Sequence, residues 1–451
     1  MMGMLNLAKL AILASILGSS FALTLVPRTT LPENPICIPN TIPPIELPLD
    51  YATCAQQVAD SKNKTHPDQG KTTDEIARAH GYSVEMYNVT TEDKYILLVH
   101  RITGGALSPA APGKPSVFLH HGMAGSSDNW LFLDGSSNLA FKLADAGYDV
   151  WLTNCRGTTY SLGHEKLNSA TDVKYWDFSW HELGMYDIPA VMAKIEEVSG
   201  NEKMFYVGYS MGTTSYFVAM SERPALNDKL IAAFMLSPCA FDGHATNPIR
   251  LISPLLGIGG KYLLDPVLRG RIEQPYELMS LFNVSLSSAC TPTAARCGLC
   301  DKIFLLFNYD AGQMNYTNLP NILSKTPNII SVKTLVHYSQ TIASCGFQQF
   351  DYGPVENLVR YGTLLPPAYN LTKITAPTYF FRGDYDNLAV PEVNNKQPYK
   401  TPYLNNLLKK FNLITFLDFS RTLKSLKVTC YLRQLCKISE WIGTCLIILI
   451  L

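Results

Sequence analysis

Short apolar runs alternate with helix-compatible stretches through the first half of the chain. The runs at residues 116–119, 147–152 and 204–207 are typical of buried strands, and residues 138–146 are predicted to form a helix between the first two. Strands that alternate with helices at this spacing predict a mostly parallel sheet with helices on both faces. The pattern therefore places the chain in the α/β class.

Before these strands the pattern changes twice. Residues 23–75 begin with a Pro-rich stretch, up to about Gly70, that has no periodicity and predicts an extended lead-in rather than a packed unit. A short helix is predicted over residues 73–79, capped by Thr72 or Thr73. Residues 82–88 and 95–102 then predict a β-hairpin.

The alternation stops after residue 240. Helical segments at 249–264, 276–283 and 333–344 are separated by loops, without regular strands. We interpret residues 241–370 as a cap inserted into a core formed by residues 76–240, because caps of this kind shield a reaction from water. The alternative is that these apolar helices are ordinary core. The cap interpretation requires the strand predicted at 377–381, within residues 371–393, to return to the sheet.

Composition narrows the class of partner. With 451 residues and 47% hydrophobic content, the chain can bury a large core. Lys and Arg total 37, as do Asp and Glu, so the charge gives no reason to expect a nucleic acid or an anionic membrane as partner. Residues 1–22, with one charge at Lys9 and a small-residue cleavage site at Ser20-Phe21-Ala22, predict a signal peptide. Their apolar run is too short for a membrane anchor, and no transmembrane segment is expected after cleavage.

Secretion predicts glycans and disulfides. The glycosylation sequons are at Asn63, Asn88, Asn283, Asn315 and Asn370. The cysteine count is 11, which leaves at least one cysteine free, and a local disulfide is predicted from Cys290 to Cys297 or Cys300. Cys297-Gly-Leu-Cys300 has no second such pair and no His pair beside it, so we expect neither a metal nor a cofactor.

The most informative segment is Gly208-Tyr209-Ser210-Met211-Gly212, which directly follows an apolar run. It matches a nucleophile elbow, in which a strand turns sharply into a helix and exposes a serine at the turn. A surface turn with an ordinary serine is the alternative. The predicted strand before the motif and the helix-compatible residues 213–220 after it favour the elbow.

A second loop complements this motif. His120-His121-Gly122-Met123-Ala124-Gly125 follows the strand at 116–119, where an α/β-hydrolase places its second oxyanion donor. The predicted donors are the backbone N–H groups of Met123 and Met211. Their side chains are incidental to this chemistry.

With these motifs placed, the sequence resembles the acid lipase family, the neutral-lipid lipases that include lysosomal acid lipase and gastric lipase. The resemblance extends from about Ile76 to about Val393, and the elbow carries Met211 where the family usually has Gln. The matching blocks are His121 to Trp130, Ala146 to Gly157, Trp176 to Trp180, Tyr186 to Ala190, His337 to Gln340, Phe347 to Gly353 and Pro366 to Tyr369.

The resemblance implies an α/β-hydrolase fold and a Ser-Asp-His triad. Ser210 is then the nucleophile, and Asp386 is the acid that orients the histidine, with Asp384 as the alternative acid. The implied activity is hydrolysis of carboxylic esters of neutral lipids, either triacylglycerol or sterol ester. A lipid or a lipid–water interface is the implied partner, and the implied location is extracellular or lysosomal.

The third member of the triad is missing from the expected place. The family's histidine follows the acid by some tens of residues in an Asn-His-Leu-Asp-Phe context, but the last histidine here is His337, and Phe416 precedes Leu417-Asp418-Phe419. Residues 394–451 therefore look like an unrelated tail, as a readthrough or mispredicted exon would produce. His121 and His337 match family residues outside the triad. The others, predicted at the surface or in the core, are His66, His80, His100, His120, His164, His181 and His244.

Three hypotheses follow from this conflict. The first is a lipase whose C-terminal segment is defective or incomplete in this sequence. The second is a lipase homologue that binds or carries lipid without turnover. The third is a product whose tail exposes enough apolar surface to cause misfolding.

Overall fold

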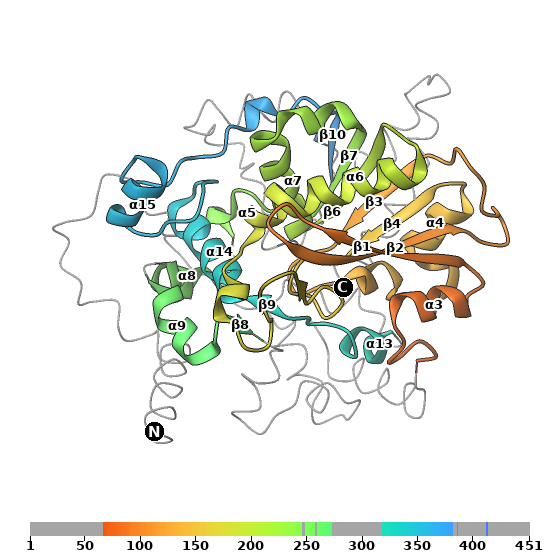
Figure 1. Cartoon of the computed structure of the whole chain (residues 1–451), viewed down its shortest axis with the longest axis horizontal. Helices are drawn as coiled ribbons and strands as arrows, with labels where there is room; N and C mark the ends of the chain where they lie inside the picture. The colour runs from red at the N-terminus through yellow and green to blue at the C-terminus, as the bar shows by residue number, and fades with distance from the viewer. Residues whose placement is uncertain are drawn as a thin grey trace.

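The computed structural model describes residues 66–245, 249–257, 259–272, 318–381, 386 and 412–413. Within these residues the main sheet has the strand order β1-β2-β4-β3-β6-β7-β10-β11, with β5 beside β2 (Figure 1). The strands are β1 (Ser83–Thr90), β2 (Tyr95–Gly104), β3 (Ser116–His120), β4 (Asp149–Thr153), β5 (Gly163–His164), β6 (Met204–Tyr209), β7 (Leu230–Leu236), β10 (Thr378–Phe381) and β11 (Asn412–Leu413). The hairpin β1–β2 and the pair β2–β4 are antiparallel, and the pairs from β4 to β11 are parallel. The prediction of a mostly parallel sheet is confirmed.

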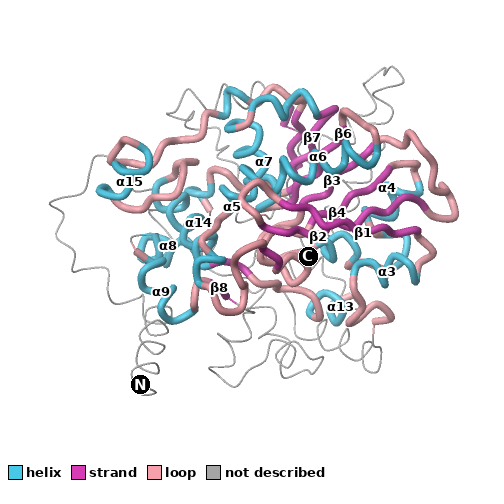
Figure 2. Tube along the Cα trace, in the orientation of Figure 1, coloured by secondary structure: helices cyan, strands magenta, loops and turns pink. Residues whose placement is uncertain are grey.

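Helices cover both faces of this sheet (Figure 2). Alternate strand residues point to opposite faces, so Phe118 and Tyr206 belong to one apolar cluster while Val117 and Val207 belong to the other. The first cluster packs against α6 (Ile188–Ser199) and α7 (Met211–Glu222), and the second against α3 (Thr73–Ala79) and α4 (Leu139–Asp145). Strands buried on both faces are expected to be apolar throughout, as the runs in the sequence are.

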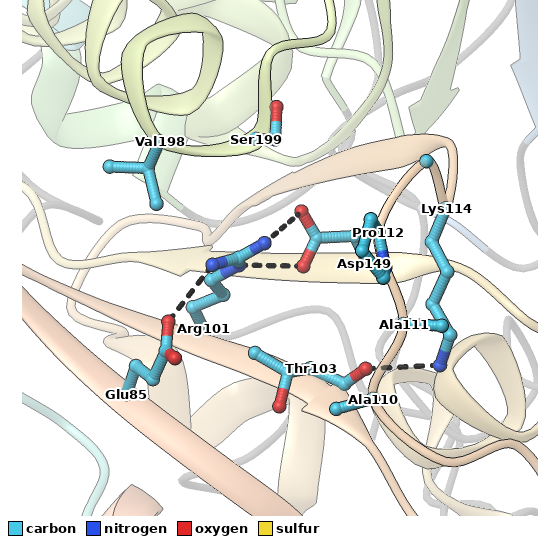
Figure 3. A pocket seen from close by; sticks show the side chains of 11 residues that line it. Glu85, Arg101, Thr103, Ala110, Ala111, Pro112, Lys114, Asp149, Val198 and Ser199 are labelled. Carbon is cyan, nitrogen blue, oxygen red and sulfur yellow. Dashed lines mark hydrogen bonds and ion pairs between the residues drawn. The ribbon is translucent and has the colours of Figure 1, made fainter.

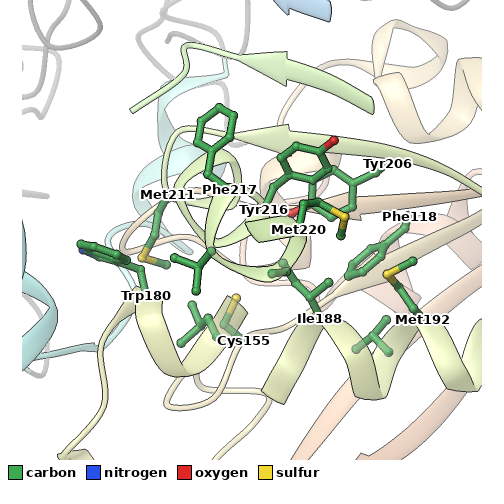
Figure 4. Packing of buried hydrophobic residues seen from close by; sticks show 14 of the residues in the cluster. Phe118, Cys155, Trp180, Ile188, Met192, Tyr206, Met211, Tyr216, Phe217 and Met220 are labelled. Atoms are coloured by element: carbon green, nitrogen blue, oxygen red, sulfur yellow. The ribbon is translucent and has the colours of Figure 1, made fainter. Parts of the chain in front are cut away.

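The helix α7 lies at the centre of the first cluster. Its residues 211–221 are all buried, so the helix packs against the protein on every side rather than on one face. Figure 4 shows Phe217 and Tyr216 of this helix together with Tyr206 of the sheet and with Ile188 and Met192 of α6. The segment that begins at Ser210 is therefore held rigidly from all sides.

The elements of the proposed cap are α8 (Ile249–Gly257), α9 (Gly260–Leu268), β8 (Arg271–Ile272), α13 (Leu319–Leu323), β9 (Ile330–Ser331), α14 (Val332–Ser344) and α15 (Pro354–Tyr361). Figure 1 shows α8, α9, α14 and α15 at the end of the molecule away from the sheet, whereas α13 lies beside α3. The chain then returns in β10, where Thr378 pairs with Ala233 of β7. This pairing is the condition that the cap interpretation set.

Some predicted elements differ from the observed ones. A single helix over 249–264 is wrong, because the helix ends at Gly257 and a second one begins at Gly260. Gly259 between them has a φ of 122°, which an α-helix does not contain. The segment predicted as a helix at 276–283 lies outside the described residues.

The end of the lead-in also departs from expectation. His66 and Asp68 are buried, and His66 Nε2 lies 3.0 Å from Asp134 Oδ1. Thr73 Oγ1 donates to buried Asp128 at 2.7 Å. Residues 66–73 are therefore packed onto the core rather than extended away from it.

Short helical turns connect the main elements. They are η1 (Ser127–Leu131), η2 (Gly135–Ser137), η3 (Val173–Trp176), α5 (Trp180–Glu182), η4 (Leu183–Asp187), η5 (Pro224–Lys229), η6 (Asp242–His244) and η8 (Leu371–Lys373). None of the helices in the described part of the chain has the length and apolarity needed to cross a bilayer.

Two predicted glycosylation sites fall on the described surface. Asn88 in β1 and Asn370 are exposed, as an attached glycan requires. Asn63, Asn283 and Asn315 lie outside the described residues, as do Cys290, Cys297 and Cys300. Cys345 forms a disulfide, whereas Cys155 and Cys239 are free and buried.

Candidate active site

Ser210 occupies the turn between β6 and α7. Its backbone has φ 49° and ψ −114°, a region that L-residues rarely adopt. The Ser210 N–H donates to the Leu236 carbonyl at 2.9 Å, which fastens the turn to β7. The strain is thus held in place by the sheet, as expected for a serine that must stand clear of the strand ends.

The flanking glycines are required by close packing. A Cβ on Gly208 would lie 2.9 Å from the backbone of Gly212, and a Cβ on Gly212 would lie closer than 3.0 Å to the His120 carbonyl oxygen. Both contacts are with backbone atoms, which cannot rotate away. The helix α7 can therefore approach β3 and β6 only because these positions have no side chain.

Gly212→Ala is expected to lower both stability and ester hydrolysis, because the new methyl group displaces α7 from β3. Overpacking of this kind costs about 1–3 kcal/mol. Gly260→Ala in α9 is the matched control, since the nearest atoms to its added Cβ are at 3.4 Å. Thermal denaturation of both variants measures the difference, and equal melting temperatures would contradict the packing argument.

The loop after β3 packs directly against this turn. A Cβ on Gly122 would lie 3.0 Å from the Tyr209 ring and 3.2 Å from Ser210 Cβ. The next residue is Met123, and the first residue of α7 is Met211. The first N–H groups of a helix have no intrahelical partner, so the Met211 amide is available to an oxyanion.

His121 is fixed beneath this loop in one tautomer. Its Nε2 accepts the Cys155 N–H at 3.1 Å, so the ring proton is on Nδ1, which donates to the Gly122 carbonyl at 2.8 Å. Burial lowers the pKa of His121 to about 4. The ring is therefore a neutral support for the loop, and both nitrogens are engaged.

Cys239 is the recorded hydrogen-bond neighbour of the Ser210 hydroxyl. The two atoms, Ser210 Oγ and Cys239 Sγ, are 3.9 Å apart. Burial raises the pKa of the Cys239 thiol well above its usual value. The thiol is therefore neutral and does not act as a base for Ser210.

The cap reaches the same helix. Tyr338 of α14 lies with its hydroxyl 2.8 Å from Thr214 Oγ1, and Thr214 in turn donates to the Cys239 carbonyl at 2.6 Å. Thr214 follows Ser210 by one helical turn. The cap therefore contacts α7 within a turn of the proposed nucleophile.

Asp386 is buried near this turn. After burial, which is the largest cause in each case, the charge of Asp386 raises the pKa of Tyr209, of Cys239 and of Asp242. Tyr209 is adjacent to Ser210 in the sequence, Cys239 contacts it, and Asp242 lies on the same loop as Cys239. The structure thus brings Asp386 to the Ser210 end of the sheet, whereas Asp384 lies outside the described residues.

Asp242→Asn is expected to stabilise the protein at alkaline pH. Burial and then Asp386 raise the pKa of Asp242 from 3.8 to about 7, so its ionised form is disfavoured in the fold. A raised carboxyl pKa means that stability is lost as pH rises from 3.8 through 7, by about 2–4 kcal/mol. Melting temperatures at pH 8 and pH 4 test this, with the exposed Asp228→Asn as control. A variant that melts like the wild type at pH 8 would contradict it.

The histidines with described side chains hydrogen-bond to groups other than Ser210. His120 lies between Tyr206 OH, at 2.7 Å, and Cys155 Sγ, at 2.9 Å, while His337 Nε2 donates to the Gln348 carbonyl at 3.0 Å. The other recorded side-chain partners are Asp134 for His66, Asp68 for His80, Asn154 for His100, the Lys166 amide for His164 and Tyr369 for His181. The side chain of His244 is not among those described.

A separate cavity lies at the opposite end of the sheet (Figure 3). Its volume is about 380 Å³, and it is lined by Arg101 and by Asp149, the first residue of β4. Arg101 pairs with Asp149 at 2.7 Å and with Glu85 at 2.9 Å. Ligands of parallel α/β sheets bind at the carboxyl ends of the strands, so this cavity at the amino end is not the site of Ser210 chemistry.

Cys239, Tyr338 and Asp242 lie near Ser210 although the sequence patterns did not predict them there. One signal was available for Cys239, because it follows the carboxyl end of β7, the strand next to β6. No pattern in the sequence brings Tyr338 to α7. That contact depends on how the cap folds back onto the core.

Comparison with known proteins agrees with this arrangement. Residues 73–134 match the family described as a partial alpha/beta-hydrolase lipase region, and residues 115–248 match the alpha/beta hydrolase fold. Lipase lipl-1 of Caenorhabditis elegans is 34% identical, over 78% of this chain and 88% of the relative. Human lipase member K is 35% identical, over 74% and 83%, and human gastric triacylglycerol lipase is 33% identical, over 73% and 82%. The chain therefore belongs to the acid lipase family of α/β-hydrolases.

Proposed function

We propose that this protein is a lipase that hydrolyses carboxylic esters of neutral lipids, triacylglycerol or sterol ester, through an acyl-enzyme on Ser210. The observation that carries the proposal is the strained turn that holds Ser210 between β6 and α7, with the loop after β3 packed against it. Names of similar proteins, including gastric triacylglycerol lipase, support the substrate class.

The chemistry follows from this geometry. The Ser210 oxygen attacks the ester carbonyl carbon, and the backbone N–H groups of Met123 and Met211 stabilise the negative oxygen of the tetrahedral intermediate. The alcohol leaves with a proton, and water then hydrolyses the acyl-Ser210 ester by the reverse route. Asp386 orients the imidazole that carries the proton in both steps.

The source of that imidazole decides the activity. Eight of the nine histidines have described side chains, and the partners recorded for those eight do not include Ser210. The proposal therefore assigns the base to a form of the C-terminal segment that carries a histidine, which residues 394–451 of this sequence do not. Sequencing the native transcript from the Asp386 codon tests this directly. A histidine codon within the next few tens of residues is the expected result.

A native protein that hydrolysed neither short-chain nor long-chain esters would contradict the lipase proposal. The assay pairs 4-nitrophenyl butyrate, which is soluble, with a trioleoylglycerol emulsion. The second candidate function is lipid binding without turnover, and the absence of a histidine after His337 favours it. That function predicts lipid binding that is unchanged in Ser210→Ala, with no ester hydrolysis by either protein.

We place the mature protein outside the cytosol, in extracellular fluid or in the lysosome. Support comes from the signal-peptide pattern at residues 1–22 and from the exposed sequons at Asn88 and Asn370. Glycosidase treatment of the secreted protein tests the two sites. It is expected to shift the electrophoretic mobility of the wild type, and each of the variants Asn88→Gln and Asn370→Gln is expected to show a smaller shift. A lipid–water interface is the partner that this activity requires.

A further inference from the structure

The helix α15 and the segment after it carry an exposed apolar ridge. Val355 is 81% exposed and Val359 is 76% exposed, and Leu358 lies one turn from Val355 on the same side of the helix. The α15 ridge is defined as Val355, Leu358, Val359, Leu364 and Leu365, each of them more than half exposed. Soluble proteins rarely expose contiguous apolar surface without a use for it.

The ridge is held rigidly from beneath. Asn357 is completely buried, and its Nδ2 donates to Asp351 Oδ1 at 2.7 Å and to the Leu364 carbonyl at 3.0 Å. Its Oδ1 accepts the Tyr352 N–H at 2.9 Å. A single buried amide thus ties the helix to both segments that flank it. Because the ridge is already ordered, it loses little conformational entropy when it binds to another surface.

The charges of α15 cancel locally. Arg360 Nε donates to Glu356 Oε1 at 2.7 Å, and the guanidinium lies 4.2 Å from the centre of the Tyr352 ring. Arg360 is therefore turned onto the protein rather than presented as a free cation. Attraction to an anionic membrane requires several unpaired basic groups. The charge pattern of the ridge fits an uncharged surface.

The position of the ridge relates it to the cap. Figure 1 shows α15 at the outer edge of the molecule, at the end where α8, α9 and α14 lie and away from the sheet. The Tyr361 hydroxyl at the end of α15 donates to the Phe350 carbonyl at 2.9 Å, and Phe350 packs with Val332 and Val336 of α14. Since α14 contacts α7 through Tyr338, the ridge is connected to the elements around Ser210.

We propose that the α15 ridge inserts into the surface of a neutral lipid aggregate and so attaches the enzyme to its substrate phase. This inference rests on the proposed function, because a lipase has to stay at the surface of its insoluble substrate. Insertion removes the apolar side chains from water, which is the main driving force for attachment of amphipathic segments to lipid. Electrostatic attraction contributes little.

The test measures partition of the full chain onto droplets of trioleoylglycerol coated with phosphatidylcholine, by flotation. Val355→Ser/Val359→Ser is expected to weaken binding about tenfold or more, from the apolar area of two valine side chains. Leu107→Ser is the matched control, since Leu107 is 79% exposed in the connection between β2 and β3. It is expected to bind as the wild type does, and raising the salt concentration is expected to leave binding unchanged.

Each other outcome overturns the inference. Unchanged binding of the double variant removes the ridge as the attachment site, and equal loss in Leu107→Ser shows that any exposed apolar residue suffices. Binding confined to vesicles that contain phosphatidylserine shows a charged surface instead. A wild-type dimer that the double variant abolishes, measured by analytical ultracentrifugation, makes a second copy the occupant.

The same variants separate this inference from the proposed function. Hydrolysis of soluble 4-nitrophenyl butyrate depends on the site at Ser210 and not on attachment to lipid. If the protein binds droplets through the ridge but hydrolyses no ester, the ridge inference stands and the lipase proposal fails. If the protein hydrolyses the soluble ester but binds droplets equally well without the ridge, the lipase proposal stands and the ridge inference fails.

Discussion

Replacing residues 394–451 with the C-terminal segment of human gastric triacylglycerol lipase is expected to raise hydrolysis of 4-nitrophenyl butyrate by several orders of magnitude. Among the eight histidines with described side chains, none is hydrogen-bonded to the Ser210 hydroxyl, and residues 394–451 contain no histidine, so we expect the leaving alcohol to lack its proton donor. Loss of the triad histidine costs about 10⁶ in turnover in subtilisin. The replacement restores the group whose absence sets that cost.

Ser210→Ala gives the expected result a sharp internal control. The serine and histidine of a triad act as a unit, so removal of either one costs about as much as removal of the whole triad. In the chimera Ser210→Ala is expected to abolish the restored activity, whereas in the 451-residue chain it is expected to change the small residual rate very little. Burst kinetics with 4-nitrophenyl butyrate count the acylated serine in the chimera directly.

Two outcomes would contradict this account. Equal and high activity in the chimera and in the 451-residue chain would show that another residue already serves Ser210 as base. A folded chimera that stays inactive, with circular dichroism like that of the starting chain, would show that the missing histidine is not what limits turnover. In an active chimera, Asp386→Asn is expected to lower the activity strongly and Asp384→Asn is not, since only Asp386 is expected to orient the restored imidazole.

Elements with a strong local pattern were predicted closely. The helix α3 has the predicted ends, and β3 and β4 differ from prediction by one or two residues at their ends. Each is either a run of apolar residues buried on both faces or a helix with an evident cap, so neighbouring residues determine it. The sharp turn between strand and helix at Ser210 was predictable for the same reason, because Gly208 and Gly212 are the small residues that such a close backbone approach requires.

The surroundings of Ser210 were not predictable in the same way. Cys239 contacts Ser210 because β7 lies beside β6, and Asp242 follows on the same loop. Tyr338 contacts Thr214, one turn beyond Ser210, because α14 packs against α7. These contacts join residues far apart in the chain, and no local pattern encodes them. His121 illustrates the point, since the proximity of its ring to the site suggests a base, while its two hydrogen bonds make it a support for the loop.

Lys333→Met is the second substitution with a large expected effect, on stability rather than on chemistry. Lys333 of α14 is buried, and its ammonium group lies 3.1 Å from Glu182 Oε1 of α5. The variant leaves the Glu182 carboxylate, whose side chain is 18% exposed, without its buried cation, and breaking a buried pair costs at most about 3–5 kcal/mol. Melting temperatures at pH 7 measure the loss, and the exposed Lys174→Met is the control.

The cost of Lys333→Met is expected to shrink in acid. Burial raises the pKa of Glu182, but the charges of Lys333 and then of His181 lower it by more than burial raises it. The net pKa is about 2 rather than 4.5. This depressed pKa contributes stability that is present above pH 4.5 and is lost as the pH falls through 2. Without Lys333 the carboxyl is expected to be protonated at pH 3.5, where it no longer needs a cation.

Lys333→Met/Glu182→Gln is expected to recover part of the loss at pH 7, because it removes both charges rather than one. A loss that is the same at pH 7 and pH 3.5, or that the double variant does not reduce, would contradict the role of the pair. The result bears on function, because the pair joins α14 to α5 while Tyr338 of α14 contacts α7 behind Ser210. Because the pKa of Glu182 is about 2, this link between α14 and α5 stays ionised at pH values where a glutamate with an ordinary pKa would be protonated.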